Sequence, residues 1–205
     1  MKLRIASLTL LCLALVAVIP ASAQVLYKNG SLNGTVDAWT INFGYTVSDT
    51  FNATGTMTGF YFDVWEFPGD TVLSVDYQIT SAEFGGTTYA SGTASVADSF
   101  ISVNQYGYDI DHITVSGLNL AVSGNYWLNL DNAVSAQGNP VYWDENSGPS
   151  QASESALGTI PSESFEIVGG SGSSSSSGQT PEPTSIMLFG SGILGLAGVL
   201  RRKLF

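Results

Sequence analysis

Cysteine is almost absent from this sequence, since Cys12 is the only one among the 205 residues. It lies in an apolar run near the N-terminus, and the residues before it, Thr9-Leu10-Leu11, lack the small residue that a lipoprotein cleavage site has there. We expect this run to be removed, which leaves a mature chain without a thiol. Disulfides, thiolate catalysis and cysteine metal sites are therefore excluded together.

Basic residues are also scarce, with six Lys and Arg against seventeen Asp and Glu. Five of the six lie near the chain ends, so residues 24–180 keep Lys28 alone against sixteen acids, a net charge of −15. Such a charge excludes nucleic acid and anionic lipid as partners. It is compatible with plain solubility outside the cell, and equally with attraction of cations.

Histidine occurs once, at His112, so no pair of imidazoles is present to bind zinc. Strand alternation predicts that His112 is a partly exposed strand residue, and the sequence has no G-x-S-x-G motif. The acids include enough carboxylates for a glycosidase, but their spacing selects no catalytic pair. We therefore predict a protein that is not an enzyme and has no cofactor, with calcium as the one candidate ion.

The N-terminus has the three parts of a secretory signal peptide. Lys2 and Arg4 precede an apolar run over residues 5–19, and Ala21-Ser22-Ala23 supplies an A-x-A cleavage site. We predict that residues 1–23 are a signal peptide, which signal peptidase cuts before Gln24. The alternative is a retained membrane anchor, but the small residues after the apolar run favour cleavage and export.

The C-terminus also has three parts, in a fixed order. Pro181-Glu182-Pro183 comes first, an apolar run over residues 186–200 follows, and Arg201-Arg202-Lys203 comes last. As a helix, this run would span about 22 Å, which is less than the ~30 Å of a hydrocarbon core. These properties favour a sorting tag that holds the chain in the membrane until an enzyme processes it. The basic residues would then lie on the cytoplasmic side.

This tail, residues 181–205, resembles the PEP-CTERM sorting signal. The resemblance implies that the protein is the substrate of an exosortase-type enzyme in a Gram-negative bacterium that makes extracellular polysaccharide. It also implies that processing occurs near Pro181-Glu182-Pro183 and that the final location is the cell surface or the extracellular matrix.

Between the two ends, composition divides the chain into a domain and a spacer. Residues 24–168 have regular apolar spacing, whereas residues 169–180 are rich in Gly and Ser and predict a flexible linker. The domain has no sustained helical period, and alternating runs such as residues 57–67 and 71–79 predict about eight or nine short strands. We predict an all-β domain, an antiparallel sandwich of the jelly-roll kind, followed by a short apolar helix at 186–200.

Two groups of residues are candidate binding sites. Asp109 and Asp111 lie two residues apart on one predicted strand, so their carboxylates share a face and are a candidate calcium site. Tyr142, Trp143, Asp144, Glu145 and Asn146 combine aromatic and polar side chains beside a Gly/Pro-rich loop, and form a candidate glycan-binding site. Each group also has a structural interpretation, as solvated acids and as core residues of a strand.

The domain itself resembles the recurring domain of secreted, anchor-bearing bacterial proteins, over most of residues 25–169. The matching stretches include residues 37–51, 62–70, 125–134, 140–152 and 158–169. This resemblance implies a compact β-domain that is displayed or released at the cell surface, and it brings no catalytic residues. Our first hypothesis is a non-catalytic surface or matrix protein associated with extracellular polysaccharide or biofilm, and the alternative is a carbohydrate-binding module assisted by calcium.

Overall fold

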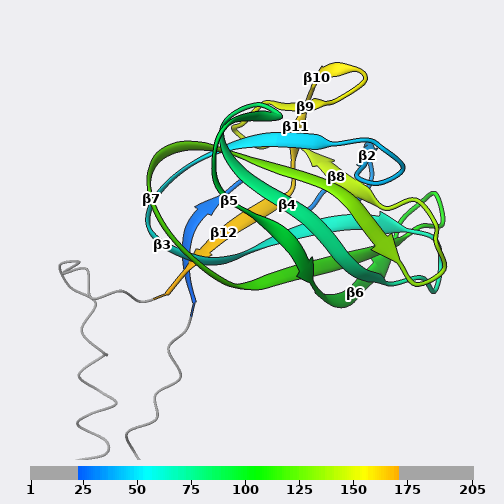
Figure 1. The fold of residues 1–205 in the computed structure, drawn as a ribbon. Helices are drawn as coiled ribbons and strands as arrows, with labels where there is room; N and C mark the ends of the chain where they lie inside the picture. Colours follow the sequence, from blue (N-terminus) through cyan, green and yellow to red (C-terminus); the bar gives the residue numbers. More distant parts are fainter. Residues whose placement is uncertain (1–22, 171–205) are drawn as a thin grey trace, which may run out of the picture. The chain divides into compact units, whose positions relative to one another are not determined.

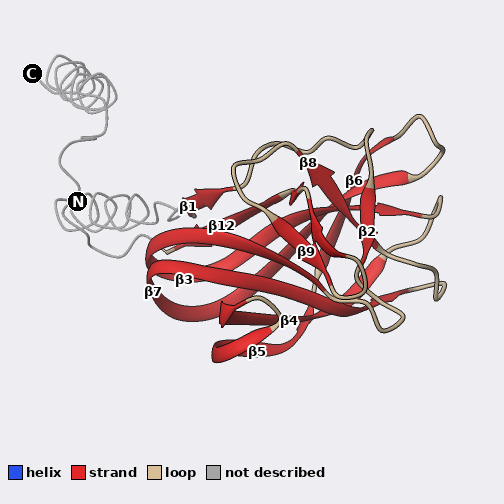
Figure 2. Cartoon of the chain, turned by 90° about the horizontal axis from the view of Figure 1, so that it is seen from above, coloured by secondary structure: helices blue, strands red, loops and turns tan. Residues whose placement is uncertain are grey.

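The computed structural model describes residues 23–170, which fold into twelve antiparallel β-strands (Figures 1 and 2). The predicted signal peptide, nearly all of the linker and the sorting tail with its apolar helix lie outside these residues. The strands are β1 (Gln24–Lys28), β2 (Ala38–Thr40), β3 (Val47–Glu66), β4 (Val72–Ala82), β5 (Gly85–Ser95), β6 (Ala97–Val103), β7 (Asp109–Ser135), β8 (Tyr142–Asn146), β9 (Ala152–Glu154), β10 (Gly158–Ile160), β11 (Ser162–Glu163) and β12 (Phe165–Gly169).

Two long strands, β3 and β7, organise the domain. They pair with each other from Val47↔Leu130 to Glu66↔Asp109, and both views show them curving together (Figures 1 and 2). The register shifts at one bulge, between Met57 and Gly59. A bulge bends a strand and increases its twist, so it allows one strand pair to pass from one layer into the other.

The two halves of this pair belong to different layers. The first half of β3 and the second half of β7 are extended by β4 and β5, whereas the other halves are extended by β12, β1 and β6. Aromatic rings meet between the layers: Phe60 lies 5.8 Å from Tyr77 of β4, and Phe51 lies 6.4 Å from Phe165 of β12, measured between ring centroids. The predicted all-β, sandwich-like fold of antiparallel strands is confirmed.

The core follows from strand alternation. Phe60, Phe62 and Val64 point inward along β3 and are fully buried, and Ile113 and Val115 do the same on β7. Burial of such side chains contributes about 1.5–3 kcal/mol each relative to exposure. Glu66 continues the inward face of β3 and is also buried, which places a carboxylate at the end of the core.

The predicted strand boundaries differ from the observed ones mainly where glycine was interpreted as a break. The residue types of Ser123-Gly124 predict a turn between two strands, but both residues lie inside β7, and Gly124 pairs with Ala53. Gly124 has φ of 128°, a conformation open to glycine, so the strand bends there without ending. Within residues 23–170, no helix is long and apolar enough to cross a membrane.

Candidate functional site

The candidate glycan-binding segment forms β8, and its tryptophan lies in the core. Trp143 is fully buried, packs edge-on against Phe62 and Phe165, and donates its indole N–H to the carbonyl oxygen of Ser164 at 2.8 Å. A buried ring has no face open to a sugar, so the structure does not support Trp143 as a stacking residue. Glycan binding by this part of the molecule stays a prediction.

The polar residues of the same segment hold the loop after β1. Asp144 accepts hydrogen bonds from the backbone N–H groups of Asn33 and Gly34 at 2.8 and 2.7 Å, and from the indole of Trp65 at 2.7 Å. Burial, partly offset by these bonds, raises the pKa of Asp144 to about 6. The contacts of Asp144 therefore assign it a structural role.

Glu145 and Asn146 are buried in the same way. The Glu145 carboxylate accepts the indole N–H of Trp39 at 3.0 Å, and the Asn146 amide donates to the carbonyl oxygens of Asn29 and Ser31. Both side chains thus join β8 to earlier parts of the chain, namely β2 and the loop between β1 and β2. Neither is directed at solvent, as a sugar-binding amide or carboxylate would be.

Tyr142, the remaining member of the segment, lines an open pocket of about 310 Å³. Trp65, Tyr106 and Tyr108 are the other aromatic residues of this pocket, and Asp37 supplies its one carboxylate. The rings of Trp65 and Tyr106 stack with centroids 5.8 Å apart, and Tyr106 is 57% exposed. We call this the tyrosine pocket. Sequence analysis missed Tyr106 and Tyr108 because they lie in and beside a loop, where alternation assigns no face.

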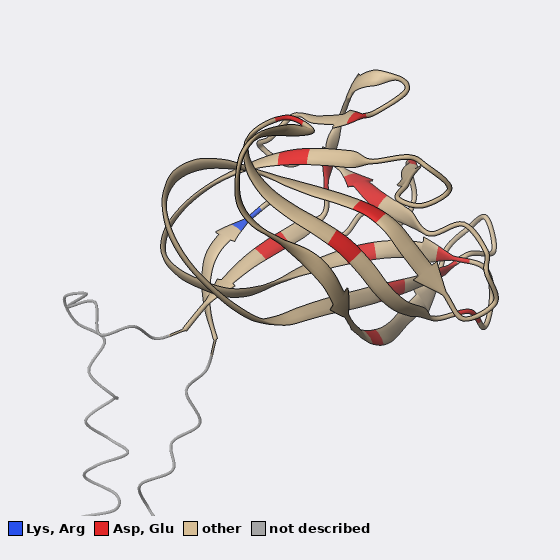
Figure 3. Ribbon diagram, viewed as in Figure 1, with Lys and Arg blue, Asp and Glu red and all other residues tan. Residues whose placement is uncertain are grey.

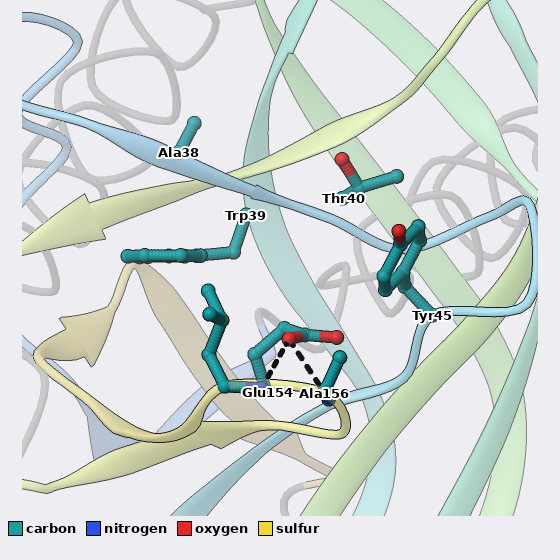
Figure 4. A pocket seen from close by; sticks show the side chains of 7 residues that line it. Ala38, Trp39, Thr40, Tyr45, Glu154 and Ala156 are labelled. Carbon is teal, nitrogen blue, oxygen red and sulfur yellow. Dashed lines mark hydrogen bonds between the residues drawn. The ribbon is translucent and has the colours of Figure 1, made fainter.

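A second pocket, of about 390 Å³, lies beside β2 (Figure 4). Trp39 and Tyr45 contribute its rings from β2 and the loop that follows, while Glu154 and Ala156 line it from the turn after β9. Ala38 lines both pockets, so β2 forms part of the wall of each. The Glu154 carboxylate accepts backbone N–H groups from Ala156 and Leu157, each at 2.9 Å, and so closes its own turn.

Each of these two pockets has flat aromatic faces and a single carboxylate. Aromatic faces with a few polar groups suit the apolar ring faces and hydroxyls of a sugar. Glycoside hydrolysis needs two carboxyl groups on either side of the bond, and neither pocket supplies a pair. The pockets therefore suit binding better than hydrolysis.

The candidate calcium residues are brought into contact with acids that sequence analysis missed. Asp111 lies with Glu66 and Asp98, and one carboxylate oxygen of each lies within 4.8 Å of those of the other two. Asp109 is not in this group, and its carboxylate accepts the backbone N–H of Gly69 at 2.7 Å. The missed signal was Glu66 itself, an acid on the apolar face of its strand.

Burial and like charge act together on the acids of this group. They raise the pKa of Glu66 to about 8, with Asp98, Asp111, Asp70 and Asp109 as its charged neighbours. Burial, with Asp98 and Asp109 beside it, raises the pKa of Asp111 to about 7. Burial is the larger cause of both shifts, and the neighbouring acids add to it because carboxylates this close resist ionising together.

The few basic groups of residues 23–170 are paired elsewhere. Lys28, the single blue segment in Figure 3, pairs with Glu166 of β12. His112 Nδ1 lies 2.7 Å from Asp63 Oδ1, and this hydrogen bond raises the pKa of His112 above its usual value. His112 is partly exposed, as predicted, and lies on the outer face of β7.

A comparison with protein families identifies the tail of the chain. The model of the PEP-CTERM protein-sorting motif matches residues 179–203, which confirms the predicted sorting signal. The motif indicates an exported protein that an exosortase processes and that is directed to the cell surface of a Gram-negative bacterium. A comparison with curated proteins found no match.

Proposed function

We propose that this chain is a non-catalytic exported protein whose β-sandwich associates with extracellular polysaccharide at the cell surface. The observation that carries the proposal is the sorting motif at residues 179–203, joined to a domain of −15 net charge with aromatic pockets. In this proposal the apolar run anchors the chain in the membrane only until the exosortase acts. The mature product then joins the matrix or biofilm.

Several features of the described residues support a role without catalysis. The tyrosine pocket and the second pocket, beside β2, contain one carboxylate each, and the Glu154 carboxylate accepts hydrogen bonds from its own turn. The His112 ring is hydrogen-bonded to Asp63. Glu163 is 0% exposed and has no access to a substrate.

The sorting part of the proposal is tested by two chains expressed in the native host. One chain ends before Pro181, and the control chain keeps the motif but lacks residues 171–178 of the Gly/Ser segment. We expect the truncated chain to be misrouted or released into the medium, and the control to reach the surface. Normal surface retention of the truncated chain would refute sorting by the motif.

The second candidate function is a carbohydrate-binding module, and the tyrosine pocket favours it. Its rings come from β3, the β6–β7 loop and β8, and its volume of about 310 Å³ lies at the low end for small-ligand pockets. In this pocket Tyr106 stacks on Trp65 and is still more than half exposed. Stacking on such rings provides sugar affinity without a strong charge on the ligand.

Affinity electrophoresis in gels that contain the host's purified extracellular polysaccharide tests this candidate. We expect Tyr106→Ala to lose most of the retardation that the natural chain has. Tyr89→Ala is the matched control, because Tyr89 is 47% exposed but lies on β5 outside the pocket. Equal retardation of all three chains would rule out binding through the tyrosine pocket.

A further inference from the structure

Three acids from three different strands meet at the end of the sandwich interior. Glu66 is the last residue of β3, Asp111 lies near the start of β7, and Asp98 lies on β6. Asp111 shares the inward face of β7 with Ile113, which is fully buried, and Glu66 follows Val64 on the inward face of β3. These carboxylates are therefore directed at the core side of the sheet.

Glu66 is the unusual member of this group. It is 1% exposed, and neither of its carboxylate oxygens has a hydrogen-bond partner among the described residues. A buried polar group without a partner costs free energy, and a buried charge without one costs more. Its geometry is that of a ligand directed into a site, with Asp98 and Asp111 completing the site.

The described part of the chain has no cation of its own for these acids. Lys28 is its only lysine or arginine and pairs with Glu166, and His112 pairs with Asp63. Asp70 and Asp109, the nearest other charged groups, are also acids. The charge of Glu66, Asp98 and Asp111 can thus be balanced only by protons or by a bound cation.

The surroundings hold these ligands in place. The backbone N–H of Val72 donates to one oxygen of Asp98 at 2.6 Å. Asp70 fixes the adjoining turn, because its carboxylate accepts the N–H of Gln137 and the amide of Asn139, each at 2.9 Å. The three ligands therefore lie on strands, and hydrogen bonds to Asp70 fix the turn beside them.

The donor set selects the kind of ion. All three side chains offer hard oxygen atoms, and the group includes no nitrogen or sulfur ligand, which favours calcium or magnesium over zinc and copper. Two oxygens that each lie 2.3–2.6 Å from one calcium ion are at most about 5 Å apart. The separation of at most 4.8 Å agrees with this limit. Magnesium usually keeps several waters and binds one or two carboxylates, so a group of three carboxylates favours calcium.

We propose that Glu66, Asp98 and Asp111 bind a calcium ion that joins β3, β6 and β7 at the end of the sandwich. Backbone carbonyls or waters complete the six to eight oxygens that calcium takes. The ion compensates the buried charge of Glu66 and fastens β6 to the β3–β7 pair. Because the chain is exported, it meets extracellular calcium, for which affinities of about 10⁻⁴–10⁻³ M are sufficient.

Calorimetry and thermal unfolding test this proposal on the full chain, purified with EDTA and moved to buffer without chelator. We expect one calcium ion to bind per chain. Calcium chloride at about 100 times Kd should raise Tm by at least about 5 °C, because only the folded state assembles the site. Magnesium chloride at the same concentration should have a smaller effect.

Glu66→Gln removes one ligand charge at nearly constant shape, and we expect it to weaken calcium binding on the order of 10- to 100-fold. Glu163→Gln is the matched control, since Glu163 is also buried with unpartnered oxygens but lies outside the group of three acids. It should keep the calcium response. If Glu66→Gln does not fold, Asp98→Asn, at a half-buried position, replaces it.

Three results would overturn the proposal: no heat and no change in Tm with calcium in the natural chain, an unchanged calcium response in Glu66→Gln and Asp98→Asn, or a stronger response to magnesium than to calcium. Loss of the response in Glu66→Gln but not in Glu163→Gln would support it. The polysaccharide-binding proposal is independent of either outcome, because its readout is retardation in the polysaccharide gel.

Discussion

The indole N–H of Trp65 donates to Oδ1 of Asp144 across 2.7 Å, and this bond joins the end of β3 to the middle of β8. The same carboxylate receives the backbone N–H groups of Asn33 and Gly34. One buried acid therefore positions the Trp65 ring and the loop that leads to β2. Both are walls of the tyrosine pocket, so the shape of the pocket depends on a residue that does not line it.

Asp144→Asn should destabilise the domain by about 1–3 kcal/mol, because one of the two acceptor oxygens becomes an NH2 group that faces other donors. The free energy of unfolding in urea measures the loss. Asp37→Asn, at an exposed position of the same pocket, is the control and should change stability by less than about 0.5 kcal/mol. Equal stability of the Asp144 variant and the natural chain would show that the three bonds contribute nothing net.

Trp143→Ala should destabilise the domain by about 3–5 kcal/mol, because it empties the space between Phe62 and Phe165 in the core. Urea unfolding and near-ultraviolet circular dichroism measure the effect. Phe100→Ala, at a position that is 62% exposed, should have little effect. A stable Trp143 variant with weakened glycan binding would contradict the core assignment and restore the ring as a binding residue.

Gly59→Ala should destabilise the domain by at least about 2 kcal/mol, because a Cβ atom at this position would lie 2.2 Å from the carbonyl oxygen of Val115. The contact is with backbone, so the bulge between β3 and β7 would have to move. Gly85→Ala is the matched control, since a Cβ there meets no atom within 4 Å. Similar stability of the two variants would mean that the bulge adapts at little cost.

Strand alternation predicted most of the fold correctly, because inward apolar residues determine which face of a strand is buried. Alternation along residues 60–66 puts Glu66 on the same strand face as Phe60 and Val64, without showing which face is buried, and it predicted the partly exposed position of His112. It could not predict that two pairs of short runs join into β3 and β7, since glycine inside a bent strand has the same local pattern as glycine in a turn. The expected eight or nine strands also fell short of the twelve observed, because β9, β10 and β11 have only two or three residues each and are too short to show alternation.

The candidate binding residues were harder to predict for a different physical reason. The Tyr142–Asn146 segment alternates aromatic and polar residues, a pattern that is the same in an exposed platform and in a strand whose polar groups are satisfied internally. Likewise, Asp109 and Asp111 share a strand face, but the partners of Asp111 come from β3 and β6, which lie far away in sequence. In both cases the sheet register decides which side chains meet, and the register cannot be read from the periodicity of the sequence.

The last prediction concerns pH and a second pair of buried acids. Glu163 is 0% exposed, its two carboxylate oxygens have no partner among the described residues, and its backbone N–H donates to Asp49 Oδ2 at 2.8 Å. Burial, followed by the charges of Asp49 and Glu145, raises the pKa of Glu163 well above its usual value. Burial also raises the pKa of Asp49 to about 6.

An acid with a raised pKa binds its proton more tightly in the folded state than in the unfolded state. Above the usual carboxyl pKa of about 4.5, the unfolded chain therefore holds fewer protons than the folded chain, and the free energy of unfolding falls as pH rises. Each such group contributes about 1.4 kcal/mol per pH unit across its own window, which for Asp49 ends near pH 6. The window of Glu163 extends further.

Glu163→Gln should therefore flatten the fall in stability, and the difference from the natural chain should grow in favour of the variant as pH rises from 5 to 8. Urea unfolding in EDTA over this range measures the two slopes, and EDTA prevents divalent ions from holding other acids in the charged form. Glu83→Gln, at an exposed position, should leave the slope unchanged. Since a buried amide changes stability by a constant amount at every pH, the slope separates titration of Glu163 from any packing defect. Parallel curves for the natural chain and Glu163→Gln would mean that Glu163 is charged in the folded protein.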